Sequence, residues 1–523
     1  MNDPLILRWQ EAEAYLRNQR MPQARRIFEH LATHPSWVAP ARLRLTRIAL
    51  AHGHLRDAVA HIIAATQANE NDPSVIEAIC AALCQLGEIE LALDMIHSQV
   101  VAACDDAHVL AGIAKQLCDQ SLPDHALPLL HRARALGLDD APLHYLTGLC
   151  LLYLGDLEAA DNAFETCLQR APLHAACHRQ IARIRRASSQ QNHVARLQSA
   201  LSQLGRDHPD APPLYFALFK ELDDLGDTTA AWSALDAGMR ARRRQVQYDS
   251  AAEANLFKRL RQVRPGTAGE GHGEDGGATP IFIIGQPRSG TTLLERLLTA
   301  SSAVADGGEL RDFAFQLRWL CDIPLSALVD VPLIEKFLAQ SPDIALLGQR
   351  YLSHTRWRAA GKPFYTDKLP ANFALAGMIA RALPQARLLH MRRSPMDTCF
   401  SNLKELFADA YPHSYDQIEM ATHYRHYRDL MTHWHSAFPG RILDIHYEKL
   451  VSAPDTCMRE ILAFCGISAP AETIHPPIQG SIATASSVQL REPVHTRYVD
   501  GWCRYADRLA PMMDALPGTL LEQ

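Results

Sequence analysis

The fold of the second half of the chain is decided by one stretch, Pro280-Ile-Phe-Ile-Ile-Gly-Gln-Pro-Arg-Ser-Gly-Thr-Thr-Leu-Leu-Glu-Arg-Leu-Leu298. Its first five residues are apolar and rich in β-branched side chains, which is typical of a buried strand. The residues after Thr292 have the spacing of an amphipathic helix. A strand, a glycine loop and a helix in this order bring backbone N–H groups and a helix N-terminus around an anion. We therefore predict a phosphate-binding loop at 285–292.

The loop differs from that of nucleoside triphosphatases in the position of its cation. Gly285 and Gly290 have the expected spacing, but Thr291 stands where that motif needs lysine. A cation comes earlier, as Arg288. This disfavours ATP or GTP chemistry with loop-bound magnesium, and so a kinase-like phosphotransferase.

A second strand and helix are predicted farther along the chain. Residues 386–391 have the pattern of another strand, and Arg392-Arg393-Ser394-Pro395 follows. Ser394 suits a helix N-cap and Pro395 suits the first helical position. The helix is expected to continue to Lys404. Arg393 thus stands between a predicted strand and a predicted helix.

The block Pro-Arg-Ser-Gly-Thr-Thr directly after a strand resembles the 5′-phosphosulfate loop of sulfotransferases, which use 3′-phosphoadenylyl sulfate (PAPS) as sulfuryl donor. The stretch Pro287–Glu309 is similar, without a gap, to that of the tyrosylprotein sulfotransferases. The resemblance covers about 280–510 and implies an α/β domain with a P-loop-like parallel sheet. It also implies that the loop holds the 5′-phosphosulfate, through Arg288, Ser289, Gly290, Thr291 and Thr292.

The same resemblance assigns the other site residues. It gives the 3′-phosphate to Arg393 and Ser401, and places Tyr447 near the nucleotide. Glu309 corresponds to the general base, while Lys368 and Ser486 correspond to residues that stabilise charge on the transferring group. A closing loop is expected at Arg491–Trp502. No metal is required by these residues, and adenosine 3′,5′-bisphosphate (PAP) is the expected product.

Two positions depart from the tyrosylprotein pattern. Glu405 stands where that family has a further arginine, and Gly501 stands where it has a lysine in the closing loop. Arg497 or Arg504 could supply the missing charge. We assign Arg497 to the cofactor site and leave the choice between the two open.

The first half of the chain contains an internal repeat. Five alanines recur every 34 residues, a large apolar residue follows each by four positions, and a turn residue precedes each by five. The alanines are Ala24, Ala58, Ala92, Ala126 and Ala160; the turn residues are Gln19, Gly53, Gly87, Ser121 and Gly155. This pattern resembles the tetratricopeptide repeat, and its strict register disfavours an irregular helical bundle. Such an array builds a surface that usually holds a peptide or another protein.

The register of the repeat slips once. Gly226 and Ala231 restart the pattern 71 residues after Gly155 and Ala160, where two periods would give 68. We therefore expect an insertion of about three residues near 188–192. A basic cluster at Arg240 and 242–244 is interpreted as a solvated helix face.

The whole sequence predicts three parts. A repeat array is expected over 1–260, a glycine-rich linker over 261–279, and a sulfotransferase domain over 280–523. The 523 residues carry a net charge of −6, so no general attraction to nucleic acid is expected. The 12 cysteines form no CxxC pair, the N-terminus has no signal-peptide pattern, and no long apolar run predicts membrane insertion. The expected compartment is the cytoplasm.

The predicted reaction is transfer of a sulfuryl group from PAPS to a hydroxyl, with a protein or peptide tyrosine as one acceptor class. A carbohydrate or small-molecule hydroxyl remains an alternative. So does a scaffold protein that binds a nucleotide without turning it over, although pure binding needs no base such as Glu309. The oligomeric state does not follow from the sequence.

Overall fold

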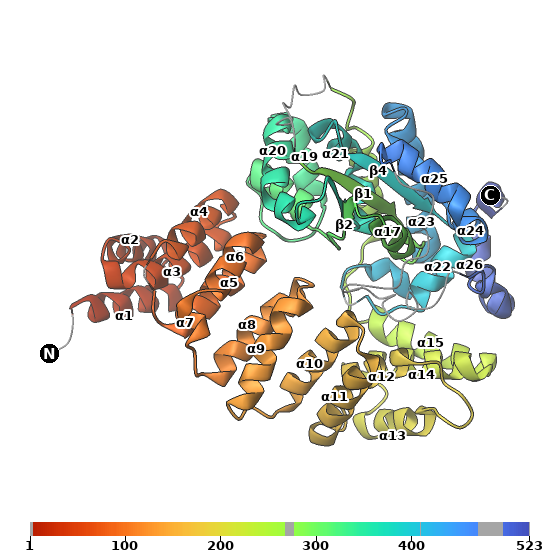
Figure 1. Cartoon of the computed structure of the whole chain (residues 1–523), viewed down its shortest axis with the longest axis horizontal. Helices are drawn as coiled ribbons and strands as arrows, with labels where there is room; N and C mark the ends of the chain where they lie inside the picture. The colour runs from red at the N-terminus through yellow and green to blue at the C-terminus, as the bar shows by residue number, and fades with distance from the viewer. Residues whose placement is uncertain (1–3, 69, 267–276, 408, 469–494, 522–523) are drawn as a thin grey trace. The chain divides into compact units, whose positions relative to one another are not determined.

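The computed structural model describes residues 4–68, 70–266, 277–407, 409–468 and 495–521 (Figure 1). Its contacts divide the chain into two compact units. The first contains Met1–Leu138 and Arg311–Trp357, and the second contains Asp139–Leu310 and Arg358–Gln523. The backbone therefore passes from one unit to the other three times. The predicted linker falls largely outside the described residues, and the linear division at 261–279 stays a prediction.

The N-terminal part of the first unit consists of antiparallel helix pairs. They are α1 (Pro4–Arg17) with α2 (Met21–Leu31), α3 (Val38–Ala51) with α4 (Leu55–Thr66), α5 (Pro73–Leu86) with α6 (Ile89–Ile96), and α8 (Ala107–Asp119) with α9 (Pro123–Ala135). The short helices η1 (Pro35–Trp37) and α7 (Gln99–Ala102) lie between pairs. This confirms the helical-repeat prediction.

The repeat alanines and turn residues behave as their spacing predicts. All five alanines are fully buried, which lets the paired helices approach closely. All five turn residues have a positive φ, from 56° at Gln19 to 95° at Gly155. Glycine adopts that conformation without strain, whereas Gln19 and Ser121 do so at some cost in free energy.

The first unit also contains three helices from the second half of the sequence, α18 (Asp312–Cys321), α19 (Val331–Gln340) and α20 (Ile344–Thr355). Arg56 of α4 donates a 3.0 Å hydrogen bond from Nε to the Trp319 carbonyl. His354 of α20 lies 3.2 Å from a carboxylate oxygen of Glu88. The sequence offered no sign of this grouping, because it depends on contacts between segments more than 260 residues apart.

The second unit begins with the remaining repeats. Their helices are α10 (Ala141–Leu154), α11 (Leu157–Arg170), α12 (Ala175–Ile184), α13 (Val194–Leu204), α14 (Ala211–Leu225), α15 (Thr228–Arg243) and α16 (Ser250–Leu260). The connection between α12 and α13 spans 185–193, so the extra length falls where the repeat register predicts the insertion.

A five-stranded parallel sheet forms the centre of the second unit. Its strands are β1 (Thr279–Gly285), β2 (Val304–Ala305), β3 (Phe364–Asp367), β4 (Arg387–Arg392) and β5 (Ile442–His446), in the order β2-β3-β1-β4-β5. The register pairs Ile283 with Leu389 across β1 and β4, and Pro280 with Tyr365 across β1 and β3. This confirms the predicted parallel α/β domain.

Helices and short 3₁₀ turns accompany the strands. They are α17 (Thr291–Thr299), η2 (Arg356–Ala359), η3 (Pro370–Leu375), α21 (Ala376–Ala382), α22 (Pro395–Leu403), η4 (Pro412–Tyr415), α23 (Gln417–Ala437), α24 (Tyr447–Ser452), α25 (Pro454–Cys465), η6 (Gly501–Arg508), α26 (Ala510–Ala515) and α27 (Gly518–Leu521). Ile281 and Ile283 pack with α17 and α25 in one apolar core. None of the helices in the described ranges combines the length and apolar character that a bilayer crossing requires.

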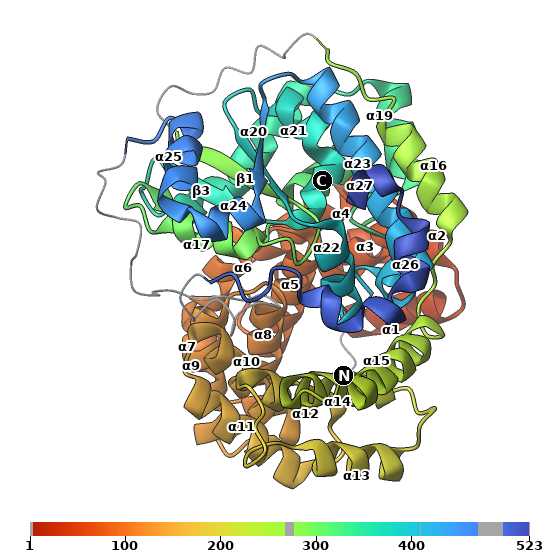
Figure 2. The same cartoon turned by 90° about the vertical axis from the view of Figure 1, so that its right-hand side faces the viewer.

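Repeat helices pack directly on the α/β part within the second unit (Figure 2). Helix α15 contacts η4 and η6, and α16 contacts α23. Arg243 donates two hydrogen bonds to Glu419, at 2.8 and 2.9 Å, and Arg242 pairs with Asp409 at 2.5 Å. The interpretation of this basic cluster as a solvated face is therefore wrong for these two arginines, since their partners lie in a distant part of the sequence.

Two local expectations need correction. Ser394 is the N-cap residue of α22 and Pro395 follows it, but the Ser394 side chain makes no capping hydrogen bond. Its backbone N–H donates instead to Glu448 at 2.8 Å. The sequence of 441–450 has the pattern of a strand that turns into a loop, but in the structure β5 is followed by the short helix α24, which begins at Tyr447.

Candidate functional site

The predicted site residues follow the carboxyl ends of all five strands. The phosphate loop follows β1, Glu309 lies four residues after β2, and Lys368 comes directly after β3. Arg393 and Tyr447 come directly after β4 and β5. Because the strands are parallel, these ends meet at one edge of the sheet, which is where open α/β sheets bind ligands.

The phosphate loop is held tightly against its surroundings. Gly290 has φ +105°, and a Cβ there would lie 2.6 Å from the Tyr447 ring, so no other residue fits without a shift. Arg288 also has a positive φ, of 65°, a strained conformation that is often found at functional sites. Asn402 of α22 donates a 2.8 Å hydrogen bond to the Pro287 carbonyl. Helix α17 begins at Thr291, so its N-terminal N–H groups face the loop.

Arg393 is fixed by several contacts beside the loop. Its Nη1 donates to the Arg288 carbonyl at 3.2 Å, and its guanidinium lies 4.7 Å from the centre of the Tyr447 ring. Its Nη2 lies 3.6 Å from Asp397, and it also hydrogen-bonds the Tyr498 carbonyl. Asp397 accepts the Asp500 N–H at 2.8 Å, which ties the C-terminal segment to α22.

Glu309 and Lys368 form an ion pair, with 2.7 Å between Nζ and Oε1. The Lys368 side chain is fully buried, whereas that of Glu309 is 39% exposed. Burial alone lowers the pKa of Lys368, but the carboxylates of Glu309 and Glu295 outweigh it and raise the pKa above its usual value. Lys368 is therefore held as a cation next to a carboxylate that solvent can reach.

Two further carboxyl groups, those of Glu295 and Asp306, lie near Lys368. Glu295 is 3.9 Å from the lysine nitrogen and accepts a 2.8 Å hydrogen bond from Thr366. Burial and the charge of Asp306 raise the pKa of Glu295 well above its usual value, and burial also raises the pKa of Asp306. Both carboxyl groups are therefore held in surroundings that disfavour their ionisation. No sequence motif pointed to this pair.

A cavity of about 490 Å³ opens beside the phosphate loop. It is lined by most of the residues assigned to the nucleotide, namely Arg288, Gly290, Thr291, Thr292, Arg393, Ser401, Tyr447 and Arg497. Ser289 is buried and donates to the Gln286 carbonyl at 2.7 Å. Among the described residues, Ser289, Glu309 and Lys368 are not part of the cavity wall. Ser486 lies outside the described residues.

The cavity has a second wall that comes from the repeat helices. Arg179 and Arg183 of α12 and Lys220 of α14 line it together with the α/β residues. Arg179 forms an ion pair with Glu405, the position where the tyrosylprotein pattern has arginine. These residues could not be predicted from the sequence, because nothing in the repeat pattern marks an arginine that contacts a distant loop.

Two arginines near Gly501 could supply the charge of the lysine that Gly501 replaces. Gly501, Arg497 and Arg504 all line the cavity. Arg504 pairs with Asp223 of α14 at 2.8 Å, while the Arg497 guanidinium lies 5.2 Å from the Tyr498 ring centre. Both arginines are thus close enough to the cavity to supply the charge that Gly501 lacks.

The phosphate loop is also supported from the repeat side. Nε2 of Gln286 lies 3.1 Å from Nε2 of His423, and Nδ1 of His423 lies 2.9 Å from Glu253 of α16. Tyr248 donates a 2.7 Å hydrogen bond to the same carboxylate. Burial opposes ionisation of Glu253, but His423 and His413 outweigh it and lower the pKa to about 2.

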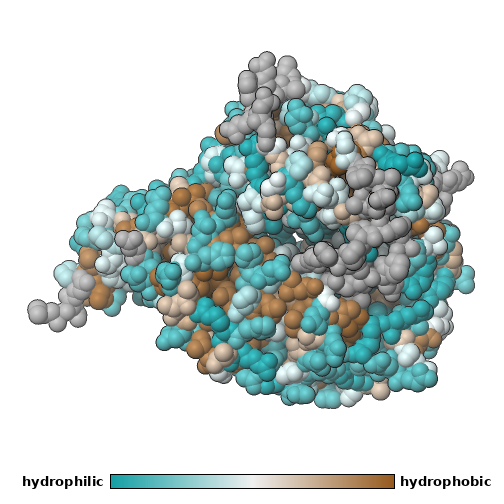
Figure 3. Space-filling view, viewed as in Figure 1, coloured by the Kyte–Doolittle hydropathy of each residue, from teal (hydrophilic) through white to brown (hydrophobic). Residues whose placement is uncertain are grey.

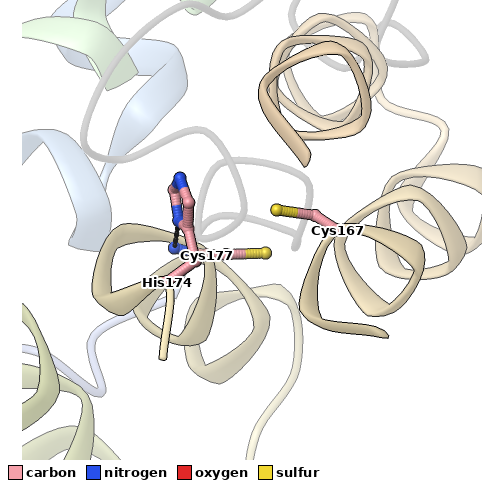
Figure 4. Close-up of side chains that lie close together, drawn as sticks. All are labelled: Cys167, His174 and Cys177. Carbon is pink, nitrogen blue, oxygen red and sulfur yellow. Dashed lines mark hydrogen bonds between the residues drawn. The ribbon is translucent and has the colours of Figure 1, made fainter. Parts of the chain in front are cut away.

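Three side chains of the kind that bind metals gather in the repeats (Figure 4). The ligand atoms of Cys167, His174 and Cys177 lie within 4.8 Å of one another. However, Nδ1 of His174 accepts the Cys177 N–H at 3.1 Å as the cap of α12, and the Cys177 thiol donates to the Phe164 carbonyl at 3.1 Å. Both cysteines are fully buried, so packing and capping account for the cluster.

Known proteins resemble the part of the chain that carries this site. Residues 280–471 match the model of the sulfotransferase family. An uncharacterized protein of Aquifex aeolicus is 29% identical over 58% of this chain and 41% of its own length. Protein-tyrosine sulfotransferase 1 of Danio rerio is 26% identical over 42% of this chain and 65% of its own. The chain thus spans less than two thirds of the length of either relative.

Solved structures include a sulfotransferase domain from the Synechococcus PCC 7002 olefin synthase, which is 20% identical with a TM-score of 0.32 and covers 43% of this chain and 88% of that domain. The phosphate loop after β1, the arginine after β4 and the family match coincide in the same stretch of sequence. Residues 280–471 of this chain are therefore similar to the sulfotransferase family.

Proposed function

We propose that the protein is a sulfotransferase that moves a sulfuryl group from PAPS to a hydroxyl acceptor. The observation that carries this proposal is the arrangement at the sheet edge, where the two predicted phosphate positions follow neighbouring strands and a lysine–glutamate pair lies next to them. The loop at 288–292 follows β1 and Arg393 follows β4, whereas Lys368 and Glu309 follow β3 and β2. A donor with two phosphate positions and one reacting group needs this combination.

The chemistry of the cavity wall fits such a donor. Eleven arginine and lysine side chains line the described wall, against four carboxylates. In the proposed complex, Arg288 and the loop N–H groups bind the 5′-phosphosulfate, while Arg393 and Ser401 bind the 3′-phosphate. Tyr447 and Arg497 complete the nucleotide contacts. None of these roles calls for a metal ion.

The reaction is an in-line displacement at sulfur. The acceptor oxygen forms a new S–O bond while the bond between sulfur and the bridging phosphate oxygen breaks, leaving its electron pair on PAP. Glu309 accepts the proton of the acceptor hydroxyl, and the exposure of its carboxylate makes it accessible to that hydroxyl. Lys368, with Ser486, stabilises the charge that develops on the transferring group.

The proposed acceptor is a tyrosine of a protein or peptide. The similarity to protein-tyrosine sulfotransferases supports this choice. The repeat array adds a second argument, because arrays of this kind offer extended surfaces for peptides. Apolar side chains gather on the face of the array around α5 and α8, as Figure 3 shows, which suits recruitment of a protein substrate or partner.

The first experiment measures thermal stability with PAP, with ATP and in buffer. A ligand at 100 times its Kd adds about 2.7 kcal/mol to the free energy of unfolding. We expect PAP to stabilise the wild type selectively, and Arg393→Ala to remove the effect. Preference for ATP would instead support a kinase-like enzyme.

The second experiment measures transfer from PAPS to a tyrosine peptide, to its phenylalanine counterpart and to a carbohydrate. Transfer to the tyrosine peptide alone is the expected result. Transfer to the carbohydrate alone would change the acceptor class. PAP binding with no transfer to any hydroxyl would favour a nucleotide-binding scaffold.

A further inference from the structure

The nucleotide cavity extends onto the repeat array. Five of its cationic side chains come from the repeats: Arg179 and Arg183 from α12, Arg185 and Arg186 from the connection after it, and Lys220 from α14. They share one cavity with Arg288 of the phosphate loop and Arg393 of the second phosphate position. The array is therefore part of the wall of this site.

Two arginines of α12 lie close to the carboxylate of Glu405. Arg179 pairs with Glu405, and both side chains are largely buried. Arg183 follows Arg179 by one helical turn and so lies on the same face of α12. Burial lowers the pKa of Arg288; Glu405 opposes this, and the charges of Arg183 and Arg393 lower the pKa further.

Clustered guanidinium groups repel one another, which costs free energy unless an anion binds between them. Like charges this close repel, and the described cavity wall carries eleven arginine and lysine side chains against four carboxylates. A ligand phosphate would relieve the repulsion, and planar guanidinium groups are suited to bind it with paired hydrogen bonds.

We propose that the repeat array completes the donor-nucleotide site, with Arg183 of α12 binding the 3′-phosphate together with Arg393. This rests on the proposed function and deepens it. The 3′-phosphate is the chosen group because Arg183 and Arg179 lie beside Glu405, four residues after Ser401. The α12 arginines thus take the place of the cation that position 405 lacks.

The test compares the affinities of full-length variants for PAP and for adenosine 5′-monophosphate (AMP), which lacks the 3′-phosphate. Loss of one charge-assisted contact is expected to weaken PAP binding by about tenfold or more. Arg183→Ala should show that loss for PAP and little change for AMP. Arg393→Ala should behave in the same way.

Controls separate this from a structural effect. Arg206, in the connection before α14, is exposed and does not line the cavity, so Arg206→Ala should bind both nucleotides like the wild type. If Arg183→Ala fails to fold, Arg183→Gln keeps a polar side chain of similar reach and is measured instead, with its unfolding temperature.

The PAP and AMP affinities test both the role of Arg183 and the proposed function. Unchanged PAP affinity in Arg183→Ala would overturn the inference and leave the proposed function unaffected. The same conclusion would follow if Arg183→Ala changed only the KM for an acidic acceptor peptide. Equal losses for PAP and AMP would also overturn it, because the contact would then not be to the 3′-phosphate. Absence of PAP binding by the wild type would instead contradict the proposed function.

Discussion

Glu309 is the residue whose role determines whether the site can catalyse transfer. Glu309→Gln keeps the size of the side chain but removes its ability to accept a proton. We expect kcat to fall by about 100-fold or more, which is the usual contribution of a general base. PAP affinity should stay unchanged, because Glu309 does not line the nucleotide cavity.

Measured kcat and PAP Kd for Glu309→Gln and for Glu158→Gln, an exposed glutamate on α11, check this prediction. A fall in kcat below tenfold would remove Glu309 from the role of base. A parallel loss of PAP affinity would show that the variant disturbs the nucleotide site instead.

Lys404 should make nucleotide binding depend on pH. Burial, with the charges of Arg288, Arg393 and Arg504, lowers the pKa of Lys404 from 10.5 to about 8, although Asp223 opposes this. Lys404 lines the cavity, so a bound anion favours its protonated form. PAP affinity should therefore fall as the pH rises through about 8, and binding near that pH should take up a proton.

The lowered pKa of Lys404 also affects the free energy of unfolding, which changes with pH in the opposite direction to PAP affinity. Between about 8 and 10.5 the unfolded chain holds the Lys404 proton and the folded chain does not, so this group's contribution to the free energy of unfolding rises with pH there. Calorimetry of PAP binding in buffers of different ionisation enthalpy, for wild type and Lys404→Met, measures the proton uptake. An identical pH profile in Lys404→Met would assign the effect to another group.

At the scale of single elements, the turns of the repeats allow a stability prediction. Ser121 is exposed and has φ 58°, a conformation that favours glycine. Ser121→Gly should raise the free energy of unfolding by about 0.5–1 kcal/mol. The substitution removes backbone strain, and this gain exceeds the larger conformational entropy that glycine loses on folding.

Gly226 is the matched control for this turn. It has φ 83°, and a Cβ there would meet nothing within 4 Å, so Gly226→Ser tests conformation alone. Gly226→Ser should lower the free energy of unfolding by about as much as Ser121→Gly raises it. Thermal or denaturant unfolding measures both variants, and opposite signs are required.

The elements could be predicted well where local chemistry determines them. The apolar run before the loop predicted β1, and the second run predicted β4 to within one residue. Pro172 favours a helix end just before it, and α11 does end at Arg170. The Ser394 cap was right in position but wrong in mechanism, because its side chain makes no capping bond.

The candidate site could be predicted only in part. Residues next to strand ends were found because motifs mark them, as with Arg288 and Arg393. Arg183, Lys404 and the Glu295–Asp306 pair could not be found, since each acquires its role from contacts with residues distant in the sequence. The roles of the predicted residues, and that of Ser486, stay predictions.

At the scale of the whole molecule, nucleotide binding should be felt by the repeats as well as the sheet. Helices α12 and α14 line the cavity, and α16 supports the phosphate loop through Glu253. PAP should therefore slow amide hydrogen exchange in α12 and α14 as well as in α17 and α22. Mass spectrometry with and without PAP measures this, with α2 and α3 of the other unit as internal references. Protection confined to 280–468 would contradict it.

The three passages of the backbone between the two compact units, after residues 138, 310 and 357, have an evolutionary consequence. End-to-end fusion of two ready-made genes yields one covalent junction between their products. Here the compact units are interlaced along the chain, so neither can be lost, exchanged or cleaved away at a single point. Exchange of a whole module at one junction would therefore divide at least one of the two units.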